Sequence, residues 1–340
     1  IRQYYWSVSP EDLVSRGLLD LYGAVVSHWH HIYQRKPHET KVRVYNPQFE
    51  KHGWQSAHTV IEIICDEMPF LVDSISMELN RMDLNIHLII SIDGLKVKRD
   101  AKGCVLEIYP PDSSATDYVK ESPIYIEIDR QSDPKVLENI THRIEKVLAD
   151  VRLVVADWQE MRQQVLDIIG YLEQGNIPTP ADELKESIAF LQWLVNDHFT
   201  FIGCQEYRLV GEGDNKAFQA DPKTGLGIFK QASCEVPKHR KMSELPAAAR
   251  AMILSDRVLI LGKTSTLSSI HRPVFTDFVA VKLFDKTGQF IGEKRFIGLY
   301  TSAAYNASPK HSPLLRRKIE TVLNNAGLPE KSHDGKNLIH

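Results

Sequence analysis

The chain has 340 residues, of which 43% are hydrophobic and 25% are charged, and its formal net charge is −3. These values are ordinary for a globular protein of two or three domains. The small net charge excludes a strongly positive electrostatic potential that would attract nucleic acid or an anionic membrane. No apolar run approaches the roughly 20 residues of a membrane span, and no signal peptide opens the chain. Because the chain starts at Ile1 rather than at Met and stops at His340, we expect a piece of a longer protein.

The cysteines are widely separated and form no Cys-x-x-Cys pair. They are Cys65, Cys104, Cys204 and Cys234. Zinc sites and disulfide frameworks usually show closely spaced cysteines. We therefore expect free thiols in a reducing cytoplasm and no metal site built on cysteine.

The first 40 residues predict an N-terminal helical segment. Ser9 is a helix cap and Pro10 suits a first turn, and an apolar stripe follows them. Three histidines lie in this stretch, but His28 and His31 share a helical face while His30 points elsewhere. Because a zinc site needs three or four converging ligands, the pattern favours surface or packing histidines.

Residues 42–88 organise the first domain: a strand, a polar corner, a second strand, a helix and a third strand follow one another. Apolar residues occupy both faces of the second strand, with Val60 and Ile64 on one and Ile61 and Ile63 on the other. This is typical of a strand that is covered on both sides, or on one side and at an interface. The helix carries a single apolar stripe, so the stretch is a β-α-β unit.

Residues 41–156 are predicted to form one domain. A hairpin is expected around residues 100–103, an alternating strand at 124–128 and a helix at 134–151. The result is a mostly antiparallel sheet with two helices on one face, which is a ferredoxin-like α+β sandwich.

Two further helices, at residues 155–172 and 180–196, predict a helical connector that spans 157–196. From residue 199 the hydrophobic residues recur with the two-residue spacing of strands, so residues 197–312 are predicted to form a second, antiparallel-sheet domain. One of its strands is expected at 225–230. Residues 313–340 carry a helix that leads towards the missing C-terminal part.

Motifs for catalysis are missing from the sequence. A dinucleotide site needs Gly-x-Gly-x-x-Gly between a strand and a helix, and neither Gly211-x-Gly213 nor Gly225-x-Gly227 stands in that context. No Gly-x-Ser-x-Gly nucleophile elbow occurs. We therefore predict no catalytic, cofactor-binding or metal-binding residue in this chain.

The corner between the second strand and the helix is the candidate site. Asp66 and Glu67 can hold an ammonium or a cationic side chain, and a helix that starts at Pro69 offers free N–H groups to a carboxylate. The same residues also suit a solvated corner, or an interface with another subunit or domain. Effector binding and an interface both stay open. The residues concerned are Asp66, Glu67, Met68, Pro69, Phe70, Leu71 and Asp73.

Long sequence words carry a resemblance to a known family. They are VRVYNP at residues 42–47, HGWQSAHTVIEI at 52–63, MPFLVDSISMELNR at 68–81, GEKRFIGLYTSAAYNASPKHSPLLRRKI at 292–319 and SHDGKNLIH at 332–340. These words make the chain resemble the N-terminal region of the large bacterial NAD-specific glutamate dehydrogenases.

The resemblance implies a parent protein several times longer that oxidises L-glutamate to 2-oxoglutarate and ammonia, with NAD as the hydride acceptor, in amino acid catabolism. It implies that the catalytic residues and the NAD-binding domain lie in the part of the parent protein that is C-terminal to this chain. It also implies that this N-terminal part contains ACT-like modules and a PAS-like module. The first domain would then be ACT-like and the second PAS-like.

The resemblance also sets expectations about partners. They are the protein's own C-terminal catalytic domain, further copies in a homo-oligomer and an amino-acid effector, without nucleic acid or membrane. NAD is expected in the full-length protein and not in this chain. The alternative is a stand-alone amino-acid-sensing or scaffold module without catalytic function.

Overall fold

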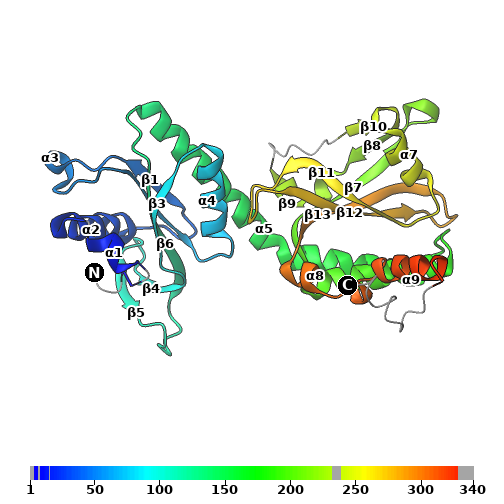
Figure 1. Cartoon of the computed structure of the whole chain (residues 1–340), viewed down its shortest axis with the longest axis horizontal. Coiled ribbons are helices and arrows are strands. Elements are labelled where there is room, and N and C mark those ends of the chain that lie inside the picture. Colours follow the sequence, from blue (N-terminus) through cyan, green and yellow to red (C-terminus); the bar gives the residue numbers. More distant parts are fainter. Residues whose placement is uncertain (1–3, 7, 15, 232–238, 328–340) are drawn as a thin grey trace. The chain divides into compact units, whose positions relative to one another are not determined.

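The computed structural model describes residues 4–6, 8–14, 16–231 and 239–327, and the structural statements below concern those residues. The chain divides into two compact units, each with its own antiparallel sheet (Figure 1). The first unit comprises Ile1–Arg152 and Ser269–Pro273, and the second comprises Leu153–Ser268 and Val274–His340. In the described part of the chain, no helix is both long and apolar enough to cross a membrane.

The sheet of the first unit runs in the order β1-β2-β6-β4-β5, and β3 also pairs with β6. Its strands are β1 (Lys41–Tyr45), β2 (Thr59–Asp66), β3 (Ile86–Ser91), β4 (Leu95–Arg99), β5 (Val105–Tyr109) and β6 (Val119–Ile128). Every pair is antiparallel, and β3 and β4 lie along successive parts of one edge of β6.

This topology is a split β-α-β unit. Because β2 and β3 flank β6, they run parallel to each other, and helix α4 (Leu71–Arg81) lies between them in the chain. The strand on the other side of β2 is β1, which precedes the unit in sequence. The α+β class predicted from the sequence is confirmed.

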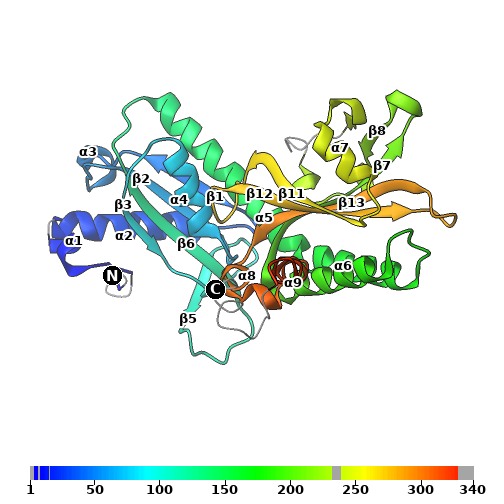
Figure 2. The same ribbon diagram turned by 45° about the vertical axis from the view of Figure 1, so that its right-hand side comes forward.

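Helices cover both faces of this sheet. Helix α2 (Leu18–Tyr33) lies on one face, and α4 and the first part of α5 (Pro134–Gln174) lie on the other (Figures 1 and 2). On the α2 side, Val60 packs in a cluster with Trp54 and Tyr125. Every residue of β2 except the last is buried. The predicted strand covered on both sides is therefore confirmed.

The N-terminal helical segment consists of α1 (Pro10–Val14) and α2, and a short helix α3 (Phe49–His52) precedes β2. The apolar stripe is interrupted because Gly17 takes an extended conformation at the start of α2. His28 is buried, and its Nδ1 lies 2.7 Å from the Tyr4 hydroxyl. Burial lowers the pKa of His28 to about 3, so it packs as a neutral ring.

Helix α5 is a single helix of 41 residues. The sequence predicted two helices here, ending at residue 151 and starting at residue 155, and this prediction is wrong. Neither glycine nor proline stands between Val151 and Val155, so nothing ends the helix there. The boundary between the two units falls within α5, after Arg152.

The sheet of the second unit runs in the order β10-β8-β7-β13-β12-β11, and β9 pairs with β7. Its strands are β7 (Phe199–Val210), β8 (Ala217–Ala220), β9 (Leu226–Gly227), β10 (His239–Lys241), β11 (Leu259–Leu267), β12 (Phe275–Phe284) and β13 (Phe290–Tyr300). The strand predicted at residues 225–230 is only two residues long. Gly227 takes a positive φ of 60°, and a short 3-10 turn follows it.

The α-helices of the second unit, besides the second part of α5, are α6 (Ala181–Trp193), α7 (Ala247–Leu254), α8 (Ser302–Asn306) and α9 (Leu315–Asn325). Short helical turns lie at Leu194–His198, Gly213–Asn215, Pro222–Thr224, Ile228–Lys230, Met242–Glu244 and Pro309–His311. Helix α9 lies beside α6 (Figures 1 and 2). Arg316 of α9 donates a hydrogen bond to Glu186 of α6 at 2.8 Å, and this ion pair links the two helices.

The three described cysteines, Cys65, Cys104 and Cys204, are free thiols. Burial raises the pKa of both Cys65 and Cys204 to about 12, so neither is a reactive thiolate at neutral pH. The fourth, Cys234, lies outside the described residues, as does the sequence word at 332–340.

The turn between β4 and β5 gives a stability prediction. Gly103 has a φ of 82°, and a Cβ there would meet the Arg35 carbonyl oxygen at 2.2 Å. Gly94 also has a positive φ, of 66°, but its Cβ would point into open space. We expect Gly103→Ala to lower the free energy of unfolding by roughly 2 to 4 kcal/mol, and Gly94→Ala by about 1 kcal/mol, in urea titrations. Equal losses in the two variants would contradict the close approach.

Candidate functional site

The corner predicted from the sequence begins at Asp66, the last residue of β2. Its carboxylate accepts hydrogen bonds from Arg35 and Arg152, both at 2.5 Å, and lies 3.0 Å from the Nδ1 atom of His38. Partial burial opposes ionisation of Asp66, but the hydrogen bonds from the two arginines outweigh it and lower its pKa to about 2. Asp66 is therefore ionised and fully engaged by side chains of its own unit.

Arg35 links Asp66 to a larger group, which we call the arginine–carboxylate cluster: Arg35, Asp66, Arg99, Glu121 and Arg152. Arg35 is 2% exposed and donates to Glu121 at 2.8 Å, and Glu121 is fully buried. Arg99 donates to both oxygens of Glu121, each at 2.7 Å. Buried charges are tolerated only when they are paired and hydrogen-bonded, as they are here.

Glu67 turns away from this cluster. It accepts hydrogen bonds from the backbone N–H of Gly94, at 2.6 Å, and from the Ser122 hydroxyl. Glu67 therefore ties the corner to the β3–β4 turn and to β6. Met68 and Leu71 are buried in the core.

Helix α4 begins at Leu71, so the prediction that Pro69 opens it is wrong. Phe70 precedes the helix with a φ of 70°, a left-handed conformation that no helical residue can take. The Phe70 ring packs against His271, with ring centroids 4.9 Å apart, and Asp73 lies 3.1 Å from Nδ1 of His271. His271 belongs to the Ser269–Pro273 segment of the first unit.

The structure therefore separates four of the predicted site residues into three groups, apart from the core residues Met68 and Leu71. Asp66 joins the arginine–carboxylate cluster, Glu67 holds the β3–β4 turn, and Phe70 and Asp73 meet His271. Asp66 also lines a cavity of about 400 Å³, together with Arg35, Arg99 and Glu121. Because these charges already pair with one another, a charged ligand would have to exchange partners with them.

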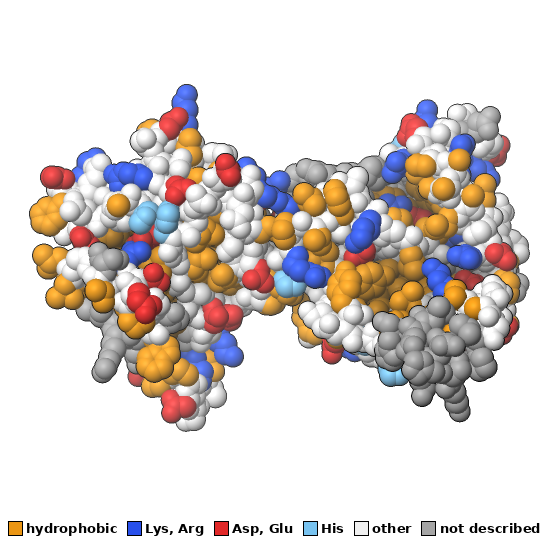
Figure 3. Space-filling model, in the orientation of Figure 1, with side chains coloured by type: hydrophobic (Ala, Val, Ile, Leu, Met, Phe, Trp, Pro, Cys, Tyr) orange, Lys and Arg blue, Asp and Glu red, His pale blue; other side chains and the backbone are white. Residues whose placement is uncertain are grey.

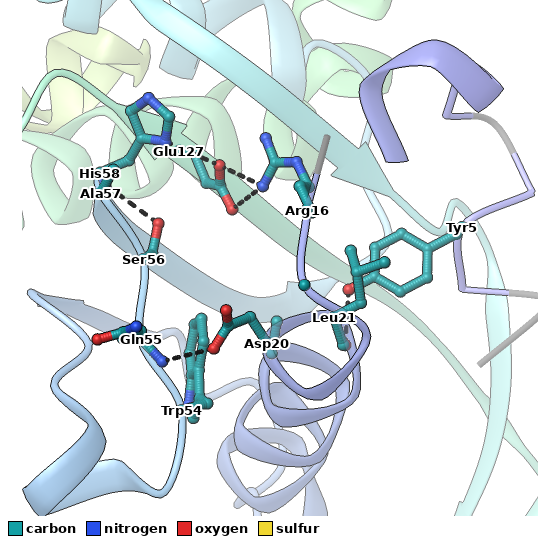
Figure 4. Close-up of a pocket in the computed structure, with 12 residues that line it drawn as sticks. Tyr5, Arg16, Asp20, Leu21, Trp54, Gln55, Ser56, Ala57, His58 and Glu127 are labelled. Carbon is teal, nitrogen blue, oxygen red and sulfur yellow. Dashed lines mark hydrogen bonds and ion pairs between the residues drawn. The ribbon is translucent and has the colours of Figure 1, made fainter. Parts of the chain in front are cut away.

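A second cavity, of about 270 Å³, lies between the start of α2 and the loop before β2 (Figure 4). Arg16 donates to both oxygens of Glu127 at 2.6 Å, and Nδ1 of His58 lies 3.3 Å from the same carboxylate. Burial lowers the pKa of His58, so its ring is neutral at pH 7. Asp20 accepts from the Gln55 backbone N–H at 3.0 Å.

Our interpretation of the sequence missed both buried carboxylates, Glu121 and Glu127. One signal was available for Glu127, which stands in the alternating strand predicted at residues 124–128. A carboxylate on an inward position of such a strand must find a cation. Its partner Arg16 is more than 100 residues away, so the sequence could not identify it.

An exposed apolar surface lies on α1, α2 and the residues before them. Hydrophobic side chains reach the surface in the part of the first unit that carries these helices (Figure 3). Trp6 and Leu18 are 86% and 82% exposed, and Leu19 and Tyr22 lie beside them around a shallow cavity. An apolar patch of this kind typically marks an interaction surface.

Comparison with known proteins gives the class of the first unit. Residues 1–144 match the family model described as glutamate dehydrogenase, ACT1 domain. Residues 312–340 match the model described as glutamate dehydrogenase, helical motif 1. The first unit is therefore an ACT domain of the glutamate dehydrogenase type.

The relatives extend this likeness to nearly the whole chain. It is 38% identical to the NAD-specific glutamate dehydrogenase of Halomonas elongata and 37% identical to that of Pseudomonas aeruginosa, over 99% of this chain and 21% of each relative. The Mycobacterium tuberculosis protein of the same name is 22% identical over 82% of this chain and 16% of its own length. The chain belongs to the NAD-specific glutamate dehydrogenase family and corresponds to the N-terminal region of its members, as the sequence motifs indicate. It spans about a fifth of the length of these relatives.

The low pKa of Asp66 gives a pH prediction. Its folded-state pKa, about 2, lies below the unfolded value, so it stabilises the fold above about pH 4, and this contribution is lost as the pH falls towards 2. We expect Asp66→Asn to cost on the order of 2 kcal/mol at pH 6, and the difference from the unaltered chain to shrink below pH 4. Urea titrations across this range measure it, with the exposed Glu107→Gln as control. A difference that does not change with pH would show that Asp66 does not carry this linkage.

Proposed function

We propose that this chain is the regulatory and assembly region of an NAD-dependent glutamate dehydrogenase, and that glutamate oxidation with NAD takes place in a catalytic part outside it. The observation that carries the proposal is the 38% identity over 99% of the chain to a protein named for that activity, of which the chain spans 21%. The ACT1 match over residues 1–144 supports the regulatory role.

We propose the domain division predicted from the sequence: a helical segment at 1–40, an ACT-like domain at 41–156, a connector at 157–196, a PAS-like domain at 197–312 and a C-terminal helix within 313–340. The PAS-like assignment rests on the strand order of the second sheet. There the first and last of the long strands, β7 and β13, pair at the centre, and β8 and β12 flank them. A pocket-bearing antiparallel sheet with α7 beside it is compatible with that class.

The corner Asp66, Glu67, Met68, Pro69, Phe70, Leu71 and Asp73 is proposed to act as a regulatory contact. Its two leading acids already hold partners, which favours a contact that relays a signal over an empty effector pocket. An amino-acid effector at this corner would compete with Arg35 and Arg152 for Asp66.

Assembly into a homo-oligomer in the cytoplasm is the remaining part of the proposal. The exposed side chains of Trp6, Leu18, Leu19 and Tyr22 offer a surface that copies of the protein could share. The parent's other partner is its own catalytic domain, and NAD is bound there.

The first test concerns catalysis. The 340-residue chain mixed with L-glutamate and NAD should produce no NADH, measured by absorbance, while the full-length protein does. Production of NADH by the 340-residue chain would contradict the proposal that glutamate oxidation takes place outside it.

The second test concerns the corner in the full-length enzyme. Because Phe70 packs on His271 and NAD is bound elsewhere, Phe70→Ala should change the response of the rate to added amino acids, with the KM for NAD kept within about twofold. Phe49→Ala, an exposed phenylalanine on α3, is the matched control. Initial rates at varied NAD and amino-acid concentrations measure both effects. If Phe70→Ala and Phe49→Ala respond alike, the corner has no regulatory role.

A further inference from the structure

The second unit contains a cavity of about 510 Å³ beneath helix α7. Side chains from α7, from the residues just before it and from the sheet form its walls, and most of them are apolar. They include Phe218, Leu245, Met252, Ile253, Ile260 and Phe278. Ligand sites usually have volumes of about 300 to 1,000 Å³ and apolar walls with a few placed polar groups, and this cavity fits both criteria.

Four charged side chains line the cavity. Lys263 pairs with Asp277 at 2.7 Å and Arg240 is exposed, so the charged groups of the floor are Glu293 and Arg295. They stand two residues apart on β13, so both point to the same face of the sheet. Glu293 is 2% exposed. The Arg295 guanidinium lies over two aromatic rings, with its Cζ atom 4.5 Å from the Tyr207 ring centroid and 5.5 Å from that of Phe278. Cation–π attraction to these two rings helps to hold the guanidinium in this position.

The two charges pair with each other incompletely. Nε and Nη2 of Arg295 both donate to a single oxygen of Glu293, Oε1. Within the described residues, Oε2 of Glu293 accepts no hydrogen bond and Nη1 of Arg295 donates none. The nearby Lys282 ammonium donates to the Ser255 carbonyl instead. Among the residues that the structure describes, the floor therefore leaves Oε2 of Glu293 and both N–H groups of Nη1 of Arg295 available to a ligand.

We propose that this cavity binds an α-amino acid with an apolar side chain. The ligand carboxylate accepts hydrogen bonds from the Nη1 group of Arg295, its ammonium group donates to Oε2 of Glu293, and its side chain fills the apolar space under α7. A zwitterion suits the floor because each ligand charge meets an opposite charge, and neither Glu293 nor Arg295 loses its present partner. The proposal concerns the second unit alone and does not depend on the proposed function.

Isothermal titration of the 340-residue chain tests the ligand class. We expect saturable binding of L-leucine or L-phenylalanine with a Kd of about 1 mM or tighter. For whichever amino acid binds, the analogue without the ammonium group (4-methylpentanoate or 3-phenylpropanoate) and the analogue without the carboxylate (isopentylamine or phenethylamine) should bind at least about tenfold more weakly. The proposal would be overturned if neither amino acid gives a heat of binding at about 10 mM, or if an analogue with only one of the two charges binds as tightly as the amino acid.

Variants locate the site. Ala249 lines the cavity and Ala251 of the same helix is exposed, so Ala249→Phe fills the cavity while Ala251→Phe is its matched control. We expect the Kd to rise at least about tenfold in Ala249→Phe and to change less than about twofold in Ala251→Phe. The double variant Glu293→Gln with Arg295→Gln should abolish binding because it removes both charges of the floor. Unchanged binding in the folded Ala249→Phe protein would place the ligand elsewhere, and if that variant does not fold, the double variant decides.

Discussion

The first unit depends on one buried cation. Arg35 is almost fully buried, and its guanidinium is satisfied by Asp66, by Glu121 and by the carbonyl oxygen of Glu39. These partners come from the end of β2, from β6 and from the loop before β1, so one set of ion pairs fixes where the chain leaving α2 meets the sheet. Removal of Arg35 itself would break both pairs at once and leave Asp66 and Glu121 with one arginine each, and breaking a buried ion pair typically costs about 3 to 5 kcal/mol.

The α2 face of the same sheet follows the same rule. Glu62 and Glu127 lie on that face and are almost fully buried, and each is held by an arginine, Arg43 or Arg16. Burial raises the pKa of Glu62, while the Arg43 ion pair opposes that rise. Ion pairs of this kind contribute little net stability, because desolvation offsets the Coulomb gain, but they allow only one placement of the groups involved. The position of α2 on the sheet is therefore specified by charge as well as by apolar packing.

Sequence periodicity was sufficient for the local elements and insufficient for the site. The two-sided apolar pattern of Val60, Ile61, Ile63 and Ile64 identified the central strand, because side-chain alternation in a strand depends only on local geometry. The pairing of Arg35 with Asp66 and Glu121 joins residues up to 86 positions apart, and no local pattern encodes it. The continuous α5 was missed for a related reason. A helix continues until a specific residue stops it, and a change of domain is not such a residue.

The two units differ in how they use arginine–carboxylate pairs. In the first unit Asp66 and Glu121 each accept hydrogen bonds from two arginines, so both carboxylates are neutralised by side chains of the fold itself. In the second unit the Glu293–Arg295 pair uses one oxygen only, and it stands on the floor of a cavity with apolar walls. A buried polar group that keeps a free hydrogen-bonding position costs stability unless something occupies that position. The saturated cluster therefore acts as structure, and the unsaturated pair is where a ligand can gain binding energy.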